Sequence, residues 1–240
     1  MKKITLTLAL ICISMANAQK WGNNKVEGDG KKTTITRSTS EYDEIAIAGS
    51  FKVDLVSGKE GTITLEGDEN LLEYVKTEVD GNQLKIQIDK NVSFKNGHRQ
   101  ISITIPFEKI SKVSFTGSGD IETKNSINAE NFEINFAGSG DGNFEVNCPN
   151  LKVALAGSGD LNVTGTSTNL IAKVAGSGDL DCSKLEAQNA EATVAGSGDL
   201  KVNCTNKLTA KVAGSGDISY KGKPENVDKK VNGSGDITSY

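Results

Sequence analysis

The 240-residue chain is poor in the side chains that most catalytic and metal sites need. It has one histidine, His98, and two arginines, Arg37 and Arg99. A zinc cluster or a Ser-His-Asp triad needs partner residues that one histidine does not provide. Scarce arginine also disfavours the groove of clustered Asp, Lys and Arg that some β-helix enzymes use to cleave acidic polysaccharides.

Large and rigid residues are scarce as well. Aromatics make up 5% of the chain, and there are 3 prolines against 26 glycines. This composition suits a fold that packs small residues closely. The net charge is -4, so no strongly basic surface is indicated and nucleic acid is not an expected partner.

A long apolar run is missing after the first 20 residues. Lys2 and Lys3 precede a short apolar stretch over 4–13, and Ala16-Asn17-Ala18 is a typical cleavage signal. We interpret residues 1–18 as a secretory signal peptide, which is too short to serve as a stable membrane span. An exported chain without a transmembrane segment after signal cleavage is therefore expected.

Cysteine pairs are also lacking once that segment is removed. An odd number remains, Cys148, Cys182 and Cys204, which argues against a complete disulfide framework. We expect all three to be buried free thiols that act as small hydrophobic residues.

What the chain does contain is a four-residue phrase, Gly-Ser-Gly-Asp, repeated seven times. It begins at residues 117, 138, 157, 176, 196, 214 and 233. The spacing stays between 18 and 21 residues. A near-constant period in this range is typical of a solenoid, in which each repeat forms one coil.

Apolar residues around each phrase recur at every second position. Counted from the first glycine, positions −4, −2, +4 and +6 are mostly apolar, as in Val153, Leu155, Leu161 and Val163. A period of two indicates β-strands with alternate residues facing inward. We predict an all-β fold, a parallel β-helix or β-solenoid with coils of about 19 residues. Right-handed winding is expected because parallel crossovers are usually right-handed.

The same alternation places both glycines of the phrase inward and its serine and aspartate outward. The inside of a tight corner has no room for a Cβ, which favours glycine there. The aspartate can accept hydrogen bonds from nearby backbone N–H groups. A second corner in each coil is less regular and falls at 165–169, 183–189 and 203–207.

The domain organisation follows from these patterns. Residues 19–38 are polar and predict a flexible arm, and 39–240 predict a single solenoid domain with a less regular half (39–112) and a repeat half (113–240). The stretch "IAIAGSFKVDLVSG" (45–58) is interpreted as a degraded repeat, and "ENLLEYVK" (69–76) as one or two turns of helix.

The outward aspartates are the strongest candidate site. Stacked coils would place like carboxylates one strand spacing apart, where each neighbouring pair repels by about 0.9 kcal/mol in water. Turn capping by solvent-exposed aspartates is the favoured interpretation, no cofactor is expected, and Ca²⁺ bound by carboxylate oxygens is the alternative. The candidates are Asp120, Asp141, Asp160, Asp179, Asp199, Asp217 and Asp236.

Three stretches together resemble a known family. They are "EYDEIAIAGSFKVDLVSG" (41–58), "EGDENLLEYVKTEVDGNQLKIQI" (66–88) and the serial "AGSGD" units. The chain resembles the head GIN domain family of exported Bacteroidetes-type proteins, also called DUF2807, over about 42 to 236. That resemblance implies a β-helix-like domain with an adhesin role, and it brings no catalytic residues.

We therefore expect a non-enzymatic protein of the cell envelope or surface, an adhesin-like module that binds a glycan or a protein. The alternatives are a carbohydrate-active β-helix enzyme and a calcium-stabilised scaffold. Periplasm, outer-membrane surface and extracellular space all fit an exported chain. Homo-oligomers are a further expectation, since exposed terminal coils can pair between chains.

Overall fold

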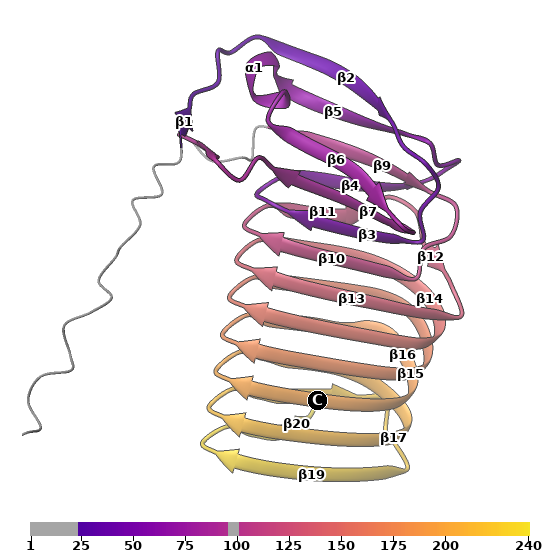
Figure 1. The fold of residues 1–240 in the computed structure, drawn as a ribbon. Coiled ribbons are helices and arrows are strands. Elements are labelled where there is room, and N and C mark those ends of the chain that lie inside the picture. The colour runs from indigo at the N-terminus through magenta and orange to yellow at the C-terminus, as the bar shows by residue number, and fades with distance from the viewer. Residues whose placement is uncertain (1–23, 96–100) are drawn as a thin grey trace, which may run out of the picture.

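The chain winds into a stack of parallel β-coils whose N-terminal end is closed by antiparallel strands (Figure 1). This computed structural model describes residues 24–95 and 101–240. The expected signal peptide over 1–18, the first five residues of the expected arm, His98 and Arg99 lie outside the described residues.

Each coil of the repeat half has one strand before its Gly-Ser-Gly-Asp corner and one after it. These strands are β10 (Lys112–Gly117), β11 (Asp120–Thr123), β12 (Ile127–Asn128), β13 (Asn131–Gly138), β14 (Asp141–Gly157), β15 (Asp160–Gly176), β16 (Asp179–Gly196), β17 (Leu200–Gly214), β18 (Ile218–Lys221), β19 (Asn226–Gly233) and β20 (Ile237–Ser239). Strands β14, β15 and β16 continue through the second corner without a break. The near strands point left while the chain descends, so the winding is right-handed (Figure 1). The predicted β-solenoid is confirmed.

Equivalent residues of successive coils lie side by side in parallel register. Val174 pairs with Val194, and Val194 with Val212, all at position −2 and all buried. The predicted inward columns are therefore confirmed through six coils. The last coil differs, because Val231 at the same position is 41% exposed.

The degraded repeat also belongs to the stack. Strands β3 (Glu44–Ala48) and β4 (Lys52–Ser57) pair in parallel with β10 and β11. On their other side, β7 (Gln83–Ile88) and β9 (Ser102–Phe107) pair in parallel with β3 and β4. The less regular half thus adds two more coils above the repeats.

Antiparallel strands cover this end of the stack. Strand β5 (Thr62–Asp68) pairs with β9, and β6 (Val75–Asp80) pairs with β7. A small separate sheet joins β1 (Asn24–Val26) to β8 (Val92–Phe94). The helix α1 (Glu69–Leu72) is one turn, the shorter of the two lengths predicted, because Val75 and Lys76 already begin β6.

The prediction of a flexible arm over 19–38 is wrong for most of its described residues, since β1 lies in its first half and a longer strand in its second. Residues Lys32–Ser38 form strand β2, which pairs antiparallel with β5 over its full length. The Arg37 guanidinium donates to the carbonyl of Leu72 at 2.7 Å and to that of Val75, which fixes the strand over α1 and β6. The sequence "KTTITRS" alternates and is rich in β-branched residues, so the strand signal was present.

The inside of the stack is packed with aliphatic side chains and with several phenylalanines, among them Phe115, Phe132 and Phe136. Cys148, Cys182 and Cys204 are all buried and free, which confirms the prediction for the three thiols.

In the described part of the chain, no helix has the length and apolar character needed to cross a membrane.

Candidate functional site

The glycines of the phrase are required by the neighbouring coil. A Cβ on Gly157 or Gly176 would lie 2.2 or 2.3 Å from the carbonyl oxygen of the equivalent glycine one coil earlier. These first glycines also have φ of +123° and +125°, a conformation that L side chains rarely adopt. The second glycines, such as Gly159, meet the same obstacle at 2.2 Å.

This geometry corrects the expected reason for glycine. The second glycine of the phrase is buried and faces inward, as expected, whereas the first is only half-buried. A Cβ is excluded by the backbone of the preceding coil, which is stacked against the glycine along the axis of the solenoid. The inside of the corner is not what excludes it.

The aspartates of the phrase form an aligned column. Asp141, Asp160 and Asp179 are register partners in successive coils. In the later coils each carboxylate accepts a hydrogen bond from the backbone N–H of the next aspartate. Asp179 accepts from Asp199 at 3.0 Å, and Asp217 accepts from Asp236 at 2.7 Å. In this part of the column the carboxylates join successive corners.

Calcium binding by this column stays a prediction to be tested. Within residues 24–95 and 101–240, no three His, Cys, Asp or Glu side chains come together in a way that could hold a metal ion. We expect the midpoint of thermal unfolding to be the same in calcium and in chelator, because Asp179, Asp199 and Asp217 already accept backbone N–H groups. A midpoint that rises with calcium and falls on chelation would instead support the calcium-stabilised scaffold.

The second corner carries an asparagine ladder. Each member after the first donates a side-chain N–H to the amide oxygen of the asparagine in the coil before it, at 2.8–3.0 Å. The members are Asn131, Asn150, Asn169, Asn189 and Asn206. The ladder fixes how the coils stack beside the variable turns, and it was not predicted from the sequence.

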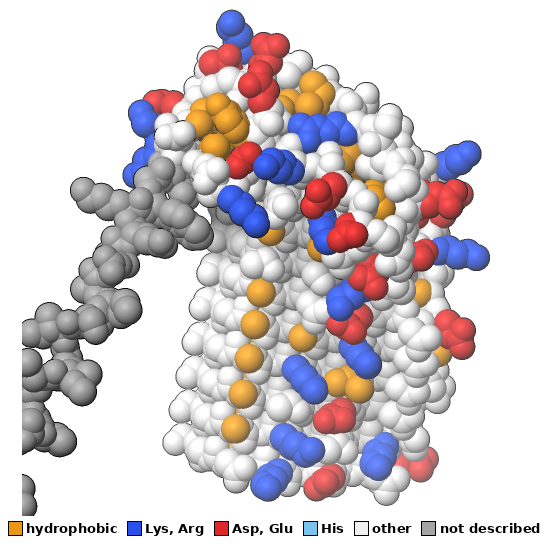
Figure 2. Space-filling view, viewed as in Figure 1, with side chains coloured by type: hydrophobic (Ala, Val, Ile, Leu, Met, Phe, Trp, Pro, Cys, Tyr) orange, Lys and Arg blue, Asp and Glu red, His pale blue; other side chains and the backbone are white. Residues whose placement is uncertain are grey.

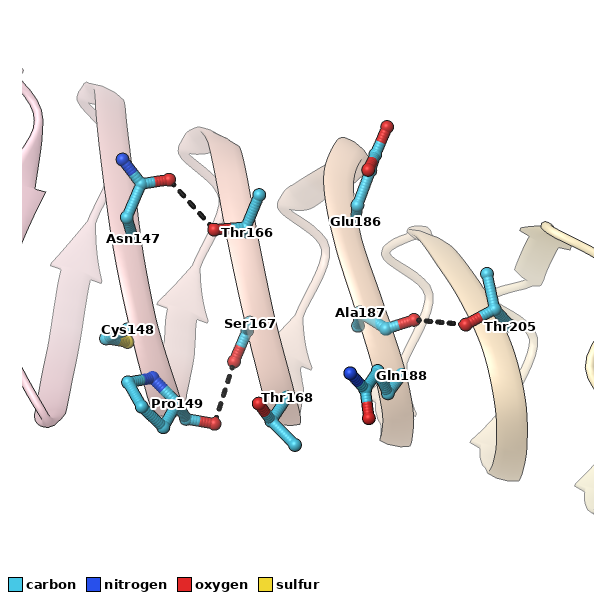
Figure 3. A pocket seen from close by; sticks show the side chains of 10 residues that line it. All are labelled: Asn147, Cys148, Pro149, Thr166, Ser167, Thr168, Glu186, Ala187, Gln188 and Thr205. Carbon is cyan, nitrogen blue, oxygen red and sulfur yellow. Dashed lines mark hydrogen bonds between the residues drawn. The ribbon is translucent and has the colours of Figure 1, made fainter.

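A groove of about 540 Å³ lies beside this ladder and crosses several coils (Figure 3). Its floor is formed by three buried register partners with small side chains, Cys148, Ser167 and Ala187. Its rims are formed by polar residues and a proline of the same coils and the next one. The rim residues are Asn147, Pro149, Thr166, Thr168, Glu186, Gln188 and Thr205.

Hydrogen bonds hold the rims in place across the coils. The Thr166 hydroxyl donates to the amide oxygen of Asn147 at 3.0 Å, and the Thr205 hydroxyl to the carbonyl of Ala187 at 3.4 Å. Figure 3 shows Glu186 extending outward from its strand, level with Thr166 of the coil before. The groove therefore presents a row of hydroxyl, amide and carboxylate groups, one coil apart.

The groove is poorly equipped for catalysis. Burial raises the pKa of the Cys148 thiol to about 11, so at neutral pH it is protonated and not in its nucleophilic form. Glu186 is the one charged residue among the described residues that line the groove. Glycoside hydrolysis usually requires two carboxylates, one on each side of the scissile bond.

At one end of the groove the regular register of the stack breaks down. The pairing of β16 with β17 shifts between Cys182 and Glu186, and again between Ala187 and Asn189. The sequence showed that the second corner varies in length, but the groove depends on which residues become register partners. The small side chains on its floor line up only once the strands are paired.

The remaining surface gives no stronger candidate. Figure 2 shows blue and red side chains interspersed on the near face, beside a vertical row of small orange ones. Aligned and exposed alanines stand just before the phrase in four successive coils, at Ala156, Ala175, Ala195 and Ala213. A row of alanines has no group that selects a ligand.

The fold and the groove define the class of the protein: a right-handed β-solenoid with a polar groove along one corner. The family model described as "Putative auto-transporter adhesin, head GIN domain" matches residues 41–224. The chain belongs to this family, which confirms the resemblance found in the sequence. Among curated proteins the comparison finds no match.

Solved structures share the fold over nearly all of the described chain. The protein is 26% identical to a putative adhesin from Bacteroides fragilis, with a TM-score of 0.85 over 90% of this chain and 100% of that one. It is 30% identical to a putative lipid binding protein from Parabacteroides distasonis, with a TM-score of 0.75 over 90% and 99%. A putative adhesin from the same species, 21% identical with a TM-score of 0.69 over 90% and 100%, shares the fold.

Proposed function

We propose that the protein is an exported, non-enzymatic binding module of the adhesin type, and that the corner groove is where it binds a glycan. The observation that carries the proposal is the groove itself, which is rimmed by polar side chains and crosses several coils, in a protein of an adhesin family. An elongated ligand can contact several coils at once, so weak contacts in each coil add up along its length.

The chemistry of the rims favours a glycan over a lipid. Hydroxyl and amide groups, as on Thr166 and Gln188, can exchange hydrogen bonds with sugar hydroxyls. Sites for apolar ligands are mostly lined by hydrophobic and aromatic side chains, whereas this lining contains no aromatic residue among those described. The single negative charge, on Glu186, disfavours acidic glycans through repulsion.

Two measurements test the proposal as a whole. Cell fractionation should find the protein in the envelope or outside the cell. The purified protein should bind neutral members of a glycan panel and should not bind phospholipid vesicles. A cytoplasmic location, or no binding across the panel, would contradict the proposal. Binding to vesicles alone would favour a lipid ligand, as the name of one structural neighbour suggests for that protein.

The groove is tested by filling it. Thr166→Trp places an indole on the exposed rim between Asn147 and Glu186. We expect it to weaken glycan binding by at least about tenfold, which corresponds to about 1.4 kcal/mol. Ala175→Trp adds the same side chain to an exposed position of the same strand, outside the groove, and should bind like the wild type. If both variants bind equally well, the ligand lies elsewhere.

A further inference from the structure

The two ends of the stack are closed in different ways. At the N-terminal end, β2, β5, β6 and α1 lie over the first coils (Figure 1). At the other end, the last coil is formed by β18, β19 and β20, and all eight residues of β19 are exposed. Val227 and Val231, on the inward side of β19, are 42% and 41% exposed. In the described chain this end is an open β-edge beside an uncovered core.

One inward position of β19 breaks the pattern of the stack. The column at position −4 contains apolar residues in every earlier coil of the repeat half, and in the last coil it contains Lys229. The register partners along the end of this column are Ala172, Ala192, Ala210 and Lys229. The three alanines are fully buried. A lysine therefore replaces a core residue at the coil where the core meets solvent.

Lys229 lies across the open end of the core. Its ammonium donates to the carbonyl of Ile237 at 3.1 Å and lies 4.6 Å from the centre of the Tyr220 ring. Strands β19 and β20 belong to opposite sides of the last coil, so the side chain bridges that coil. Its aliphatic stem covers apolar surface while its charged end stays close to water.

Without this lysine, β19 would suit a second copy of itself. In an antiparallel pair of two β19 strands centred on residue 229, Asp228 of each copy lies opposite Lys230 of the other. Val227 likewise lies opposite Val231, so charges and apolar residues both match. With the lysine, the two Lys229 side chains face each other between the joined cores. Like charges opposite each other, both removed from water, oppose the pairing strongly.

Contrary to the homo-oligomers expected from the sequence, we propose that Lys229 is an end-blocking residue that prevents the last coil from pairing end to end with a second copy of this chain. An inward-pointing charge is one of the means by which natural β-proteins protect an exposed edge. Lys229 covers the end of the core within one molecule and leaves an uncompensated charge in any end-to-end dimer.

The test compares molecular mass in solution with and without the charge. In sedimentation equilibrium over about a hundredfold range of concentration, the wild type should be a monomer. Lys229→Val restores the residue type of the column, and Lys229→Met removes the charge while keeping an unbranched stem. Both should show a concentration-dependent doubling of mass. Lys229→Arg keeps the charge and should remain a monomer.

A matched control distinguishes the effect of the inward position of Lys229 from the general effect of removing a positive charge from β19. Lys230→Val removes a lysine from the outward side of the same strand and should remain a monomer. Circular dichroism establishes that each variant is folded, and the methionine variant decides the test if the valine variant does not fold. The proposal is overturned if the wild type dimerises through this end, if the folded neutral variants stay monomeric, or if Lys230→Val associates as strongly as Lys229→Val.

Discussion

Replacing Gly176 with alanine is expected to destabilise the protein by about 2–5 kcal/mol, combining a backbone cost with a steric one. The alanine Cβ would lie 2.3 Å from the Gly157 carbonyl oxygen, far inside van der Waals contact. The φ of +125° adds strain that glycine avoids. The obstacle is backbone in the middle of a parallel stack, so neither coil can move without breaking register with its neighbours. Urea unfolding followed by circular dichroism measures the loss.

Two other glycines separate the two causes. Gly178 meets the Gly159 carbonyl oxygen at 2.3 Å but has no unusual φ, so Gly178→Ala should show the steric loss alone, about 1–3 kcal/mol. Gly81 has φ of +64° with open space around it, so Gly81→Ala should lose about 1 kcal/mol. If Gly176→Ala loses no more stability than Gly81→Ala, the coils can separate locally. Contact with the neighbouring coil is then not the reason why the phrase contains glycine.

The repeat half could be predicted because each coil stacks on its neighbour in sequence. The alternation of apolar residues around the phrase therefore predicted correctly which side chains face inward, and Val174 and Leu180 are buried as it indicated. The same rule explains the failures. Strand β2 pairs with β5, and β3 lies between β7 and β10, through contacts between distant segments that no local period reveals.

The candidate site was predictable only in part. The aspartate column followed from the period alone, and Asp141 and Asp160 are aligned as expected. The groove needed more, because one coil contributes Cys148, the next Ser167 and the third Ala187. These residues share no type, although each lies nine residues before the first glycine of the following phrase, at 157, 176 and 196. Their pairing follows from that spacing, but the groove above them is seen only once the coils are stacked.

The second large effect concerns a compensated gap in the core. Gly142 stands at position +4, where the following five coils have leucine or isoleucine. Its missing side chain is replaced by neighbours: a Cβ there would lie 2.5 Å from Leu161, 3.4 Å from the ring of Phe144 and 3.5 Å from the ring of Phe136. Phe136 also stacks on Phe115 with ring centres 5.1 Å apart. The ring of Phe136 at −2 thus takes up space that Gly142 at +4 leaves. Two coils later, Val174 and Leu180 share the equivalent space.

We expect Phe136→Val to lose about 2–4 kcal/mol, because it opens a cavity and removes an aromatic contact. Gly142→Leu should lose about 1–3 kcal/mol through overpacking. The double variant recreates the valine and leucine of the later coils, so it should be more stable than the sum of the two losses predicts, by about 1–2 kcal/mol. Urea unfolding of the four proteins closes this double-mutant cycle.

A distant pair provides the reference for that coupling. Val212 lies four coils further along the stack and shares no contact surface with Phe136, so Phe136→Val and Val212→Ala should be additive within about 0.5 kcal/mol. Additivity of Phe136→Val with Gly142→Leu would mean that the leucine cannot use the space the ring leaves. The space inside each coil would then be set by its backbone. The pairing of a large residue at −2 with a glycine at +4 would not explain how the coil of Phe136 and Gly142 fits into the stack.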